Sequence, residues 1–266
     1  MLARALSSVW QQETRIGIEI VVVDDASDDE TPELLQRWAA QGRLRWLRNE
    51  RQLGACHSRN RALNEASGKY ATGLDDDDEM LPGRIAALLA ALRPDDAFVC
   101  ASDWIVAPGG MARMRVAPAR IDRTRILSRN VVGNQILAER ARILACGGFD
   151  EALPAAQDYD LWIRMILAYG SARGLRRPLQ RIHAPEGAGA ERISTSPARR
   201  RGYWLVYRKH RPQMDERCRR AHLYNLRRAS GHATRLPRDF RFFVAGNRLR
   251  LLWHAIRDLR RDGGAS

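Results

Sequence analysis

Five consecutive acidic residues, 75–79, follow the short, mostly apolar run 70–74. Adjacent carboxylates repel and raise one another's pKa, so crowding them costs free energy unless a cation or hydrogen-bond donors offset it. A Mg²⁺ or Mn²⁺ ion binds oxygen ligands and leaves positions open for substrate phosphates, so the run could hold a metal and a nucleotide diphosphate. Taken alone, it is better explained as a solvated acidic turn, with Asp78 or Glu79 favouring the N-terminus of the helix that Pro82 begins.

A second acidic cluster, Asp24-Asp25, ends the β-branched run 18–23, which is typical of a strand buried on both faces of a parallel sheet. Thr31 is expected to cap the helix that follows, with Pro32 in its first position. The patterns predict further strands at 44–47, 70–74, 97–106 and 131–138, and helices at 2–12, 31–42, 55–66, 82–92, 140–146 and from Gln157 onward.

This alternation of strands and helices predicts an α/β fold, with a mixed, mostly parallel sheet and helices on both faces. In such sheets, ligands bind beyond the carboxyl ends of the strands. Both acidic clusters follow strands, so they are expected to converge on one crevice.

The charge of the chain is unevenly distributed. Residues 1–160 hold 24 acidic and 20 basic side chains, net −4, whereas residues 161–266 hold 7 acidic and 25 basic ones, net +18, which together give the formal +14. Such asymmetry suggests a polyanionic partner, either nucleic acid or an anionic membrane. Because 43 of the 45 basic residues are arginine, as in a GC-rich genome, part of the charge reflects codon usage. No nucleic-acid-binding motif is recognised, so no nucleic-acid partner is expected.

The cysteines, at 56, 100, 146 and 218, lack metal-ligand spacing, which favours a reduced, cytoplasmic protein. No stretch approaches the roughly 18 apolar residues of a membrane span, and the N-terminus does not resemble a signal peptide. From residue 173 the sequence becomes rich in arginine and helical in pattern. The expected organisation is therefore a catalytic domain at 1–172 and a basic, mainly helical extension at 173–266.

Several ordered blocks resemble the family 2 glycosyltransferases, which have the GT-A fold and move a sugar from a nucleotide donor to an acceptor hydroxyl. Residues 20–29 resemble the family's first nucleotide-binding turn. Asn49 and Gly54, Arg59-Asn60 and residues 66–70 resemble its N-x(4)-G, R-N and A-x-G-x-Y motifs. Residues 74–78 resemble its metal-binding D-x-D, and residues 147–151 with 157–162 its acceptor-side block. Each block is weak alone, but their order and spacing across about residues 1–165 are specific.

The resemblance implies roles for individual residues. It places the nucleotide sugar, a UDP- or GDP-sugar, against Asp24, Asp25, Arg59, Asp75 and Asp76, and a Mn²⁺ or Mg²⁺ ion against Asp75 and Asp77. Asp158 would be the catalytic base, which takes the proton of the acceptor hydroxyl in an inverting transfer. The metal would stabilise the departing nucleoside diphosphate. The acceptor would be a glycan or a lipid-linked sugar in bacterial surface-polysaccharide synthesis.

The chain departs from the family pattern in two places. Gln157 stands where many members carry Glu, which removes one carboxylate beside Asp158 and is expected to lower the pKa of that residue. The family also opens with a buried strand before the helix at 2–12, and this chain does not show one. Met1 is therefore expected to be an internal methionine of a longer reading frame. The alternatives are a non-catalytic, basic binding protein on a degenerate glycosyltransferase domain, or a nucleotidyltransferase.

For His183, Trp162, Tyr159 and the segment 238–261, the sequence supports both a functional and a structural role. His183 could be a further metal ligand, but a surface or structural role fits it better. Trp162 and Tyr159 could line an acceptor pocket, although the helical spacing of Trp162 fits a core position equally well. Residues 238–261 interleave arginine with aromatic and aliphatic residues. This segment predicts either a helix lying on the inner face of the plasma membrane or one packed on the domain.

Overall fold

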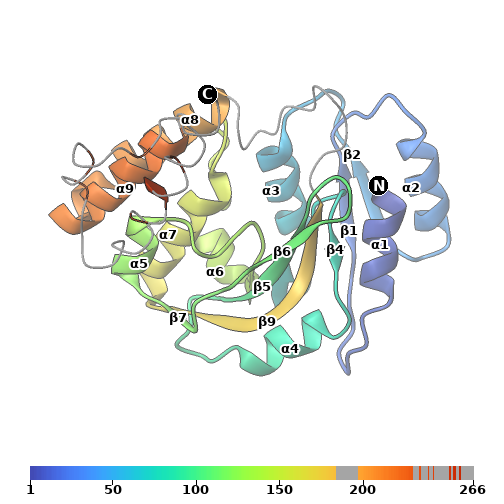
Figure 1. Cartoon of the computed structure of the whole chain (residues 1–266). Helices are drawn as coiled ribbons and strands as arrows, with labels where there is room; N and C mark the ends of the chain where they lie inside the picture. The colour runs from blue at the N-terminus through green and yellow to red at the C-terminus, as the bar shows by residue number, and fades with distance from the viewer. Residues whose placement is uncertain are drawn as a thin grey trace. The chain divides into compact units, whose positions relative to one another are not determined.

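The computed structural model describes residues 1–183 and 197–229, together with Thr234, Asp239, Phe242, Leu252, His254, Ala255 and Asp258. The described chain forms two compact units (Figure 1). Residues 1–122, 131–152 and 157–183 belong to the first unit, and residues 123–130, 153–156 and 197–229 to the second.

The first unit alternates helices and strands, as the sequence predicts. Its helices are α1 (Leu2–Trp10), α2 (Thr31–Ala40), α3 (Ala55–Glu65), α4 (Arg84–Ala91), α6 (Arg140–Ala145) and α7 (Gln157–Tyr169). Its strands are β1 (Val21–Asp24), β2 (Arg45–Arg48), β3 (Tyr70–Thr72), β4 (Glu79–Met80), β5 (Val99–Val106), β6 (Ala112–Arg115), β7 (Arg120–Ile121), β8 (Leu137–Glu139) and β9 (Ala172–His183).

The strands form two sheets. β1 and β2 pair in parallel as a two-stranded sheet, and the order β3-β8-β5-β9-β4 forms the main path of a seven-stranded sheet, with β6 on β5 and β7 on β9. The mixed α/β class is confirmed, but the expectation of a mostly parallel sheet is wrong in detail. In the seven-stranded sheet only β5 and β9 pair in parallel, because β6 returns from β5 by a tight turn and the other neighbours also run in opposite directions.

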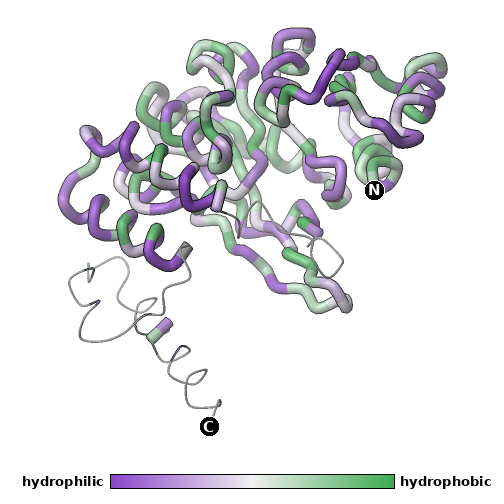
Figure 2. The backbone as a smooth tube through the Cα atoms, turned by 90° about the horizontal axis from the view of Figure 1, so that it is seen from above, coloured by the Kyte–Doolittle hydropathy of each residue, from purple (hydrophilic) through white to green (hydrophobic). Residues whose placement is uncertain are grey.

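Two apolar clusters hold the sheets to their helices. Leu6 of α1 and Leu35 of α2 are buried with Leu44 beside the sheet of β1 and β2. Leu88 of α4 is fully buried against β5, β8 and β9. In Figure 1, α4 lies below β9 and α3 lies above the sheet. Figure 2 shows hydrophobic and hydrophilic residues alternating along the helices, as expected for helices that bury one side.

Some helix ends differ from the sequence-based expectation. Thr31 lies inside the first turn of α2, and Glu30 occupies the N-cap without a side-chain hydrogen bond. Instead, the exposed backbone N–H of Thr31 donates a hydrogen bond to Asp29 Oδ1, at 3.0 Å. The helix after the acidic run begins at Arg84, with Gly83 as its N-cap, so Pro82 precedes it.

β9 was not expected from the sequence. It pairs along the whole of β5, from Val99 against Arg173 to Val106 against His183, and therefore belongs to the centre of the sheet. The sequence-based boundary at residue 172 consequently cuts a central strand from its sheet. The first unit continues through β9, and the arginine-rich helices begin beyond it.

The second unit contains α5 (Arg123–Ser128), α8 (Pro197–His210), the 3₁₀ turn Arg211–Gln213 and α9 (Glu216–Ala229). Asp215 Oδ1 accepts the Cys218 N–H at 2.7 Å and so caps α9. Asn225 of α9 donates to the Ser128 carbonyl of α5 at 3.0 Å. No helix among the described residues is both long and apolar enough to cross a membrane. Most of the predicted membrane segment, 238–261, lies outside the described residues.

Candidate functional site

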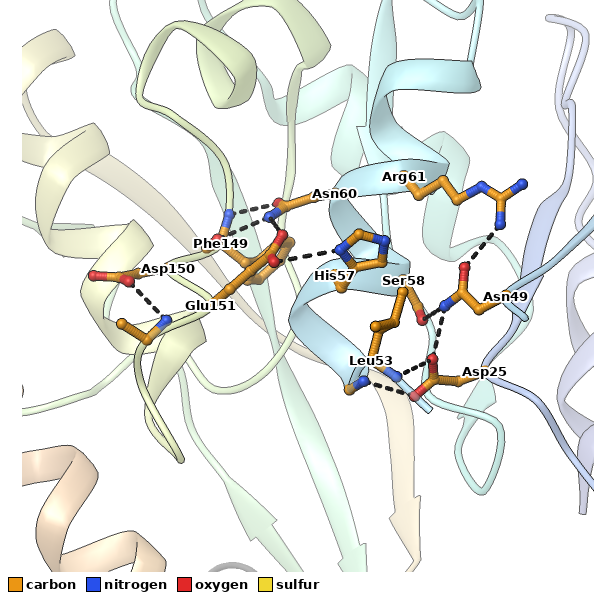
Figure 3. Close-up of polar contacts among 12 residues, drawn as sticks. Asp25, Asn49, Leu53, His57, Ser58, Asn60, Arg61, Phe149, Asp150 and Glu151 are labelled. Atoms are coloured by element: carbon orange, nitrogen blue, oxygen red, sulfur yellow. Dashed lines mark hydrogen bonds and ion pairs between the residues drawn. The ribbon is translucent and has the colours of Figure 1, made fainter. Parts of the chain in front are cut away.

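α3 is the element on which the predicted motifs meet (Figure 3). Asp25, at the end of β1, accepts three hydrogen bonds from the loop that leads into α3: from Asn49 Nδ2 at 2.7 Å, Leu53 N at 2.9 Å and Gly54 N at 2.7 Å. Burial acts to raise the pKa of Asp25, but these hydrogen bonds outweigh it and lower the pKa below its ordinary value. Asp25 is therefore a charged carboxylate that shapes loop 49–54.

Asp24 has a different environment from its neighbour. Its side chain has no exposed surface, its Oδ1 accepts the Ser27 N–H at 3.0 Å, and its Oδ2 lies 3.1 Å from Arg48 Nη1. The sequence predicted a nucleotide contact here. A carboxylate enclosed in its own turn and paired with an arginine cannot reach a ligand, so Asp24 is a structural residue of this turn. Ala26, which follows the pair, has a φ of 60°, a conformation that costs a non-glycine residue free energy.

Asn60 joins α3 to the Gly-Gly-Phe-Asp-Glu block. Its Nδ2 donates to the Phe149 carbonyl at 2.8 Å and to Glu151 Oε1 at 3.0 Å, and its Oδ1 accepts the Phe149 N–H at 2.7 Å. The amide thus pairs with the Phe149 backbone as a neighbouring strand would. Gly148 makes this approach possible, because a Cβ at that position would lie 2.5 Å from Asn60 Oδ1.

Arg59, the residue before this clamp, faces the acidic run. Its Nη2 donates to Asp75 Oδ1 at 2.7 Å, and its guanidinium lies 5.5 Å from the centre of the Phe149 ring. Burial acts to lower the pKa of Arg59, but the carboxylate of Asp75, followed by the charge of Asp158, raises it. Arg59 therefore pairs with Asp75, and the charge of Asp158 acts on the same guanidinium.

Asp75 is held by amides that the sequence-based argument did not assign. Gln135 Nε2 donates to Asp75 Oδ1 at 3.2 Å, and Asn134 Nδ2 donates to Asp75 Oδ2 at 2.9 Å. Gln135 packs closely on Gly73, since a Cβ at that position would overlap Gln135 Oε1 and force the end of the Gln135 side chain to move.

Asp78 contradicts the interpretation of the run as a solvated turn. It is 1% exposed and accepts hydrogen bonds from Asn134 Nδ2 at 3.1 Å, Gln180 Nε2 at 3.0 Å and the His183 N–H at 3.1 Å. Burial and the charge of Asp75 raise the pKa of Asp78 to about 7. The buried Asp78 side chain thus connects the acidic run to β9 by hydrogen bonds, whereas Asp76 is exposed at the turn.

The end of the run is braced by α1 and β9. Glu79, which belongs to β4 and not to a helix start, lies 2.7 Å from His183 Nε2 and 3.3 Å from Arg4 Nε. Arg4 also donates to the Asp77 carbonyl at 2.6 Å. His183 and Arg4 thus hold Glu79 from β9 and α1, and α1 fixes the position of the acidic turn.

The loop that carries Asn134 is seated on buried side chains. Arg115, paired with the buried Asp103, donates to the Val131 carbonyl at 3.1 Å, and Trp162 Nε1 donates to the Gly133 carbonyl at 3.0 Å. Gly133 has a φ of 95°, and a Cβ there would overlap the Arg115 guanidinium. Trp162 is 2% exposed, so it belongs to the core and does not line an acceptor pocket.

Asp158 lies in the first turn of α7, where the helix dipole favours a carboxylate. Ala156, two residues earlier, has a φ of 61°. Asp160 is fully buried and pairs with Arg164 at 2.8 Å, and Arg164 also donates to the carbonyls of Cys146 and Gly148. The start of α7 is thereby tied to the glycine pair next to the Asn60 clamp.

The acidic run concentrates negative charge that a divalent cation could offset. Burial, followed by the charges of Asp76 and Asp75, raises the pKa of Asp77, so a cation beside Asp77 would relieve repulsion. Within the residues that the structure describes, no three His, Cys, Asp or Glu side chains lie close enough together to hold a metal ion. Two carboxylates, with substrate phosphates completing the coordination, is an arrangement typical of Mg²⁺ sites.

Comparison with known proteins agrees with this geometry. Residues 1–135 match the family model described as glycosyl transferase family 2. The putative colanic acid biosynthesis glycosyl transferase WcaA of Escherichia coli K12 is 33% identical over 234 residues, which are 84% of this chain and 81% of that protein. WfgD of Escherichia coli, a UDP-Glc:alpha-D-GlcNAc-diphosphoundecaprenol beta-1,3-glucosyltransferase, is 26% identical over 166 residues, 62% of this chain and 64% of that protein.

Two solved structures share the fold. Staphylococcus aureus TarS 1–349 in complex with UDP superposes with a TM-score of 0.64 at 17% identity, over 97% of this chain and 84% of that one. The mannosyltransferase PcManGT of Pyrobaculum calidifontis, in complex with GDP-Man and Mn²⁺, gives a TM-score of 0.54 at 17% identity, over 100% of this chain and 72% of that one. The architecture is thus that of the GT-A glycosyltransferases. The chain belongs to glycosyl transferase family 2.

Proposed function

We propose that the chain is an inverting, metal-dependent hexosyltransferase that uses a UDP- or GDP-sugar to extend a glycan or lipid-linked acceptor in surface-polysaccharide synthesis. The observation that carries this proposal is the 2.7 Å ion pair between Arg59 and Asp75, with the charge of Asp158 acting on the same guanidinium. The names of the relatives support the pathway class, since they specify colanic acid biosynthesis and a diphosphoundecaprenol acceptor.

The donor would bind at the junction of α3 and the acidic run. Loop 49–54, which Asp25 holds in place, would receive the base, and Asp75 and Asp76 would lie toward the ribose and diphosphate. Arg59 is a cation on α3 beside these carboxylates, so it is suited to hold the anionic nucleotide.

Asp75 and Asp77 would hold the Mn²⁺ or Mg²⁺ ion. Asp75 Oδ2 accepts one hydrogen bond, from Asn134, and so retains a lone pair for the ion. When bound, the ion supplies positive charge that stabilises the leaving nucleoside diphosphate.

Asp158 would act as the general base. In an inverting transfer, the acceptor oxygen forms a bond to the anomeric carbon while the bond from that carbon to the diphosphate oxygen breaks. The proton of the acceptor hydroxyl passes to the Asp158 carboxylate. Asp158 stands in the first turn of a helix whose start is fixed by the buried pair of Asp160 and Arg164, which suits a group that must be held in position.

The test combines binding with turnover. Calorimetry with UDP and GDP, each with and without Mn²⁺, should give metal-dependent binding to the full chain. Asp158→Asn should bind the nucleotide as the parent does and lose sugar transfer by about 10²–10⁴-fold, the contribution typical of general-base catalysis. Glu33→Gln, which alters an exposed carboxylate in the first turn of another helix, α2, is the matched control and should retain most activity. Transfer by Asp158→Asn at the parental rate, or absence of nucleotide binding under every condition, would refute the proposal.

A further inference from the structure

α8 presents an exposed face that the sugar-transfer chemistry does not use. Arg200, Arg201, Trp204 and Arg208 are exposed, and Arg211 follows in the 3₁₀ turn, also exposed. Apart from the adjacent pair Arg200-Arg201, the four helical residues are spaced by three, four, seven or eight, which places them on one side of α8. We call these five residues the α8 stripe.

The opposite side of α8 anchors the helix within the second unit. Gly202 packs so closely on the Ala155 backbone that a Cβ would overlap the Ala155 carbonyl, and Val206 and His210 are buried. Trp204 is 47% exposed, with its ring 5.5 Å from that of the buried Tyr207. The α8 stripe is therefore held outward by a well-packed helix.

The segment that carries the α8 stripe has basic but no acidic residues. Residues 197–213 contain no Asp or Glu. The exposed acidic residues that follow, Asp215 and Glu216, are engaged at the start of α9: Asp215 accepts the Cys218 N–H, and Glu216 lies 2.8 Å from Arg220. The α8 stripe thus offers four guanidinium groups around one tryptophan, with no carboxylate on its own helix.

We propose that the α8 stripe docks the protein on an anionic lipid bilayer. Each Lys or Arg near an anionic membrane surface contributes about 1 kcal/mol, or about a five-fold gain in affinity. Tryptophan favours the boundary between lipid headgroups and acyl chains, where its apolar ring and polar N–H are both satisfied. A helix of 14 residues is about 21 Å long, so the stripe can lie flat along such a surface.

The same residues fit a nucleic acid less well. Proteins that bind single strands stack successive bases on several aromatic side chains along a basic groove. The α8 stripe carries one exposed aromatic ring, because Tyr207 is buried beneath it. The stripe also differs from the segment 238–261, for which the sequence predicts either membrane binding or packing on the domain.

The experiment is co-sedimentation of the full chain with vesicles of phosphatidylcholine, alone or mixed with phosphatidylglycerol. Binding should require the anionic lipid and weaken at high salt. Replacing Arg200, Arg201 and Arg208 with Gln should lower the partition coefficient about 100-fold, the product of three factors of about five. Trp204→Ala, a second and smaller change, should reduce the binding that persists at high salt.

A matched control removes three other exposed arginines, by Arg15→Gln, Arg37→Gln and Arg176→Gln, and should bind vesicles like the parent. Equal losses in both triple variants would mean that net charge alone drives binding and would overturn the proposal. So would undiminished binding by the stripe variant, or binding of short single-stranded RNA in place of vesicles. Because sedimentation needs no sugar transfer, the result does not depend on the proposed activity.

Discussion

The Asn60 clamp gives a quantitative prediction. Asn60→Ala removes two hydrogen bonds with the Phe149 backbone, at 2.8 and 2.7 Å, and one with Glu151 at 3.0 Å. Two partly buried backbone groups lose their partner, at about 1–1.5 kcal/mol each, and the exposed Glu151 adds little. The free energy of unfolding should therefore fall by about 2–3 kcal/mol.

Urea unfolding of the full chain, followed by circular dichroism, measures this loss. His57→Ala is the control, because His57 lies on the same helix and its ring is 3.3 Å from the same Glu151, but both side chains are exposed. That variant should lose less than about 0.5 kcal/mol. Asn60→Asp keeps the acceptor for the Phe149 N–H and should fall between the two. If Asn60→Ala and His57→Ala unfold at the same urea concentration, the clamp does not stabilise the fold as argued.

Three further predictions concern stability. Burial lowers the pKa of His222 to about 4 from 6.5, so the unfolded chain gains a proton between these values before the folded chain does. Urea unfolding across this pH range should show stability present above pH 6.5 and falling by about 3 kcal/mol as the pH drops to 4, and His222→Gln should flatten that dependence. Gly133→Ala should lower the free energy of unfolding, measured by thermal unfolding, by about 2 kcal/mol or more, because alanine would have to adopt a φ of 95° with its Cβ against Arg115. Unchanged stability would contradict the described loop geometry. Arg48→Ala leaves the buried Asp24 carboxylate without its ion pair and should cost about 2 kcal/mol, whereas Arg48→Lys should recover part of the loss in the same assay.

Local patterns predicted most of the first unit. The helices α3, α6 and α7 begin where the sequence placed them, and Gly54 marks the start of α3 while the pair Gly147-Gly148 marks the end of α6. The three glycines all have positive φ, as their positions at helix boundaries require.

β9 could not be recognised from the same patterns. A central strand is normally an apolar run, but β9 contains several arginines and Pro178. Tertiary contacts explain why these residues fit: Arg173 pairs with Asp96 at 2.9 Å, and the register of β5 against β9 shifts on either side of Ser102, near Pro178. The boundary predicted at residue 172 failed because these partners are distant in sequence.

The same limit applies to the site. Because acidic residues are adjacent in the sequence, a charged site could be predicted. The order of the motifs predicted that Arg59 and Asp75 contribute to the same nucleotide-binding site. The amides of Asn134, Gln135 and Gln180 come from separate parts of the chain and have no periodicity of their own. Only the folded sheet brings these amides to the acidic run, so their role in the site could not be predicted from the sequence.

α3 also limits how the chain can change in length. Three successive residues of α3 form hydrogen bonds with different parts of the chain: Ser58 with Asn49, Arg59 with Asp75, and Asn60 with Phe149. Because one residue turns an α-helix by about 100°, a single insertion or deletion within Ala55–Glu65 would redirect every later contact at once. The turn at 107–111 joins β5 to β6, and its backbone hydrogen bonds in the described part of the chain lie within the turn, so it should accept added residues with little effect.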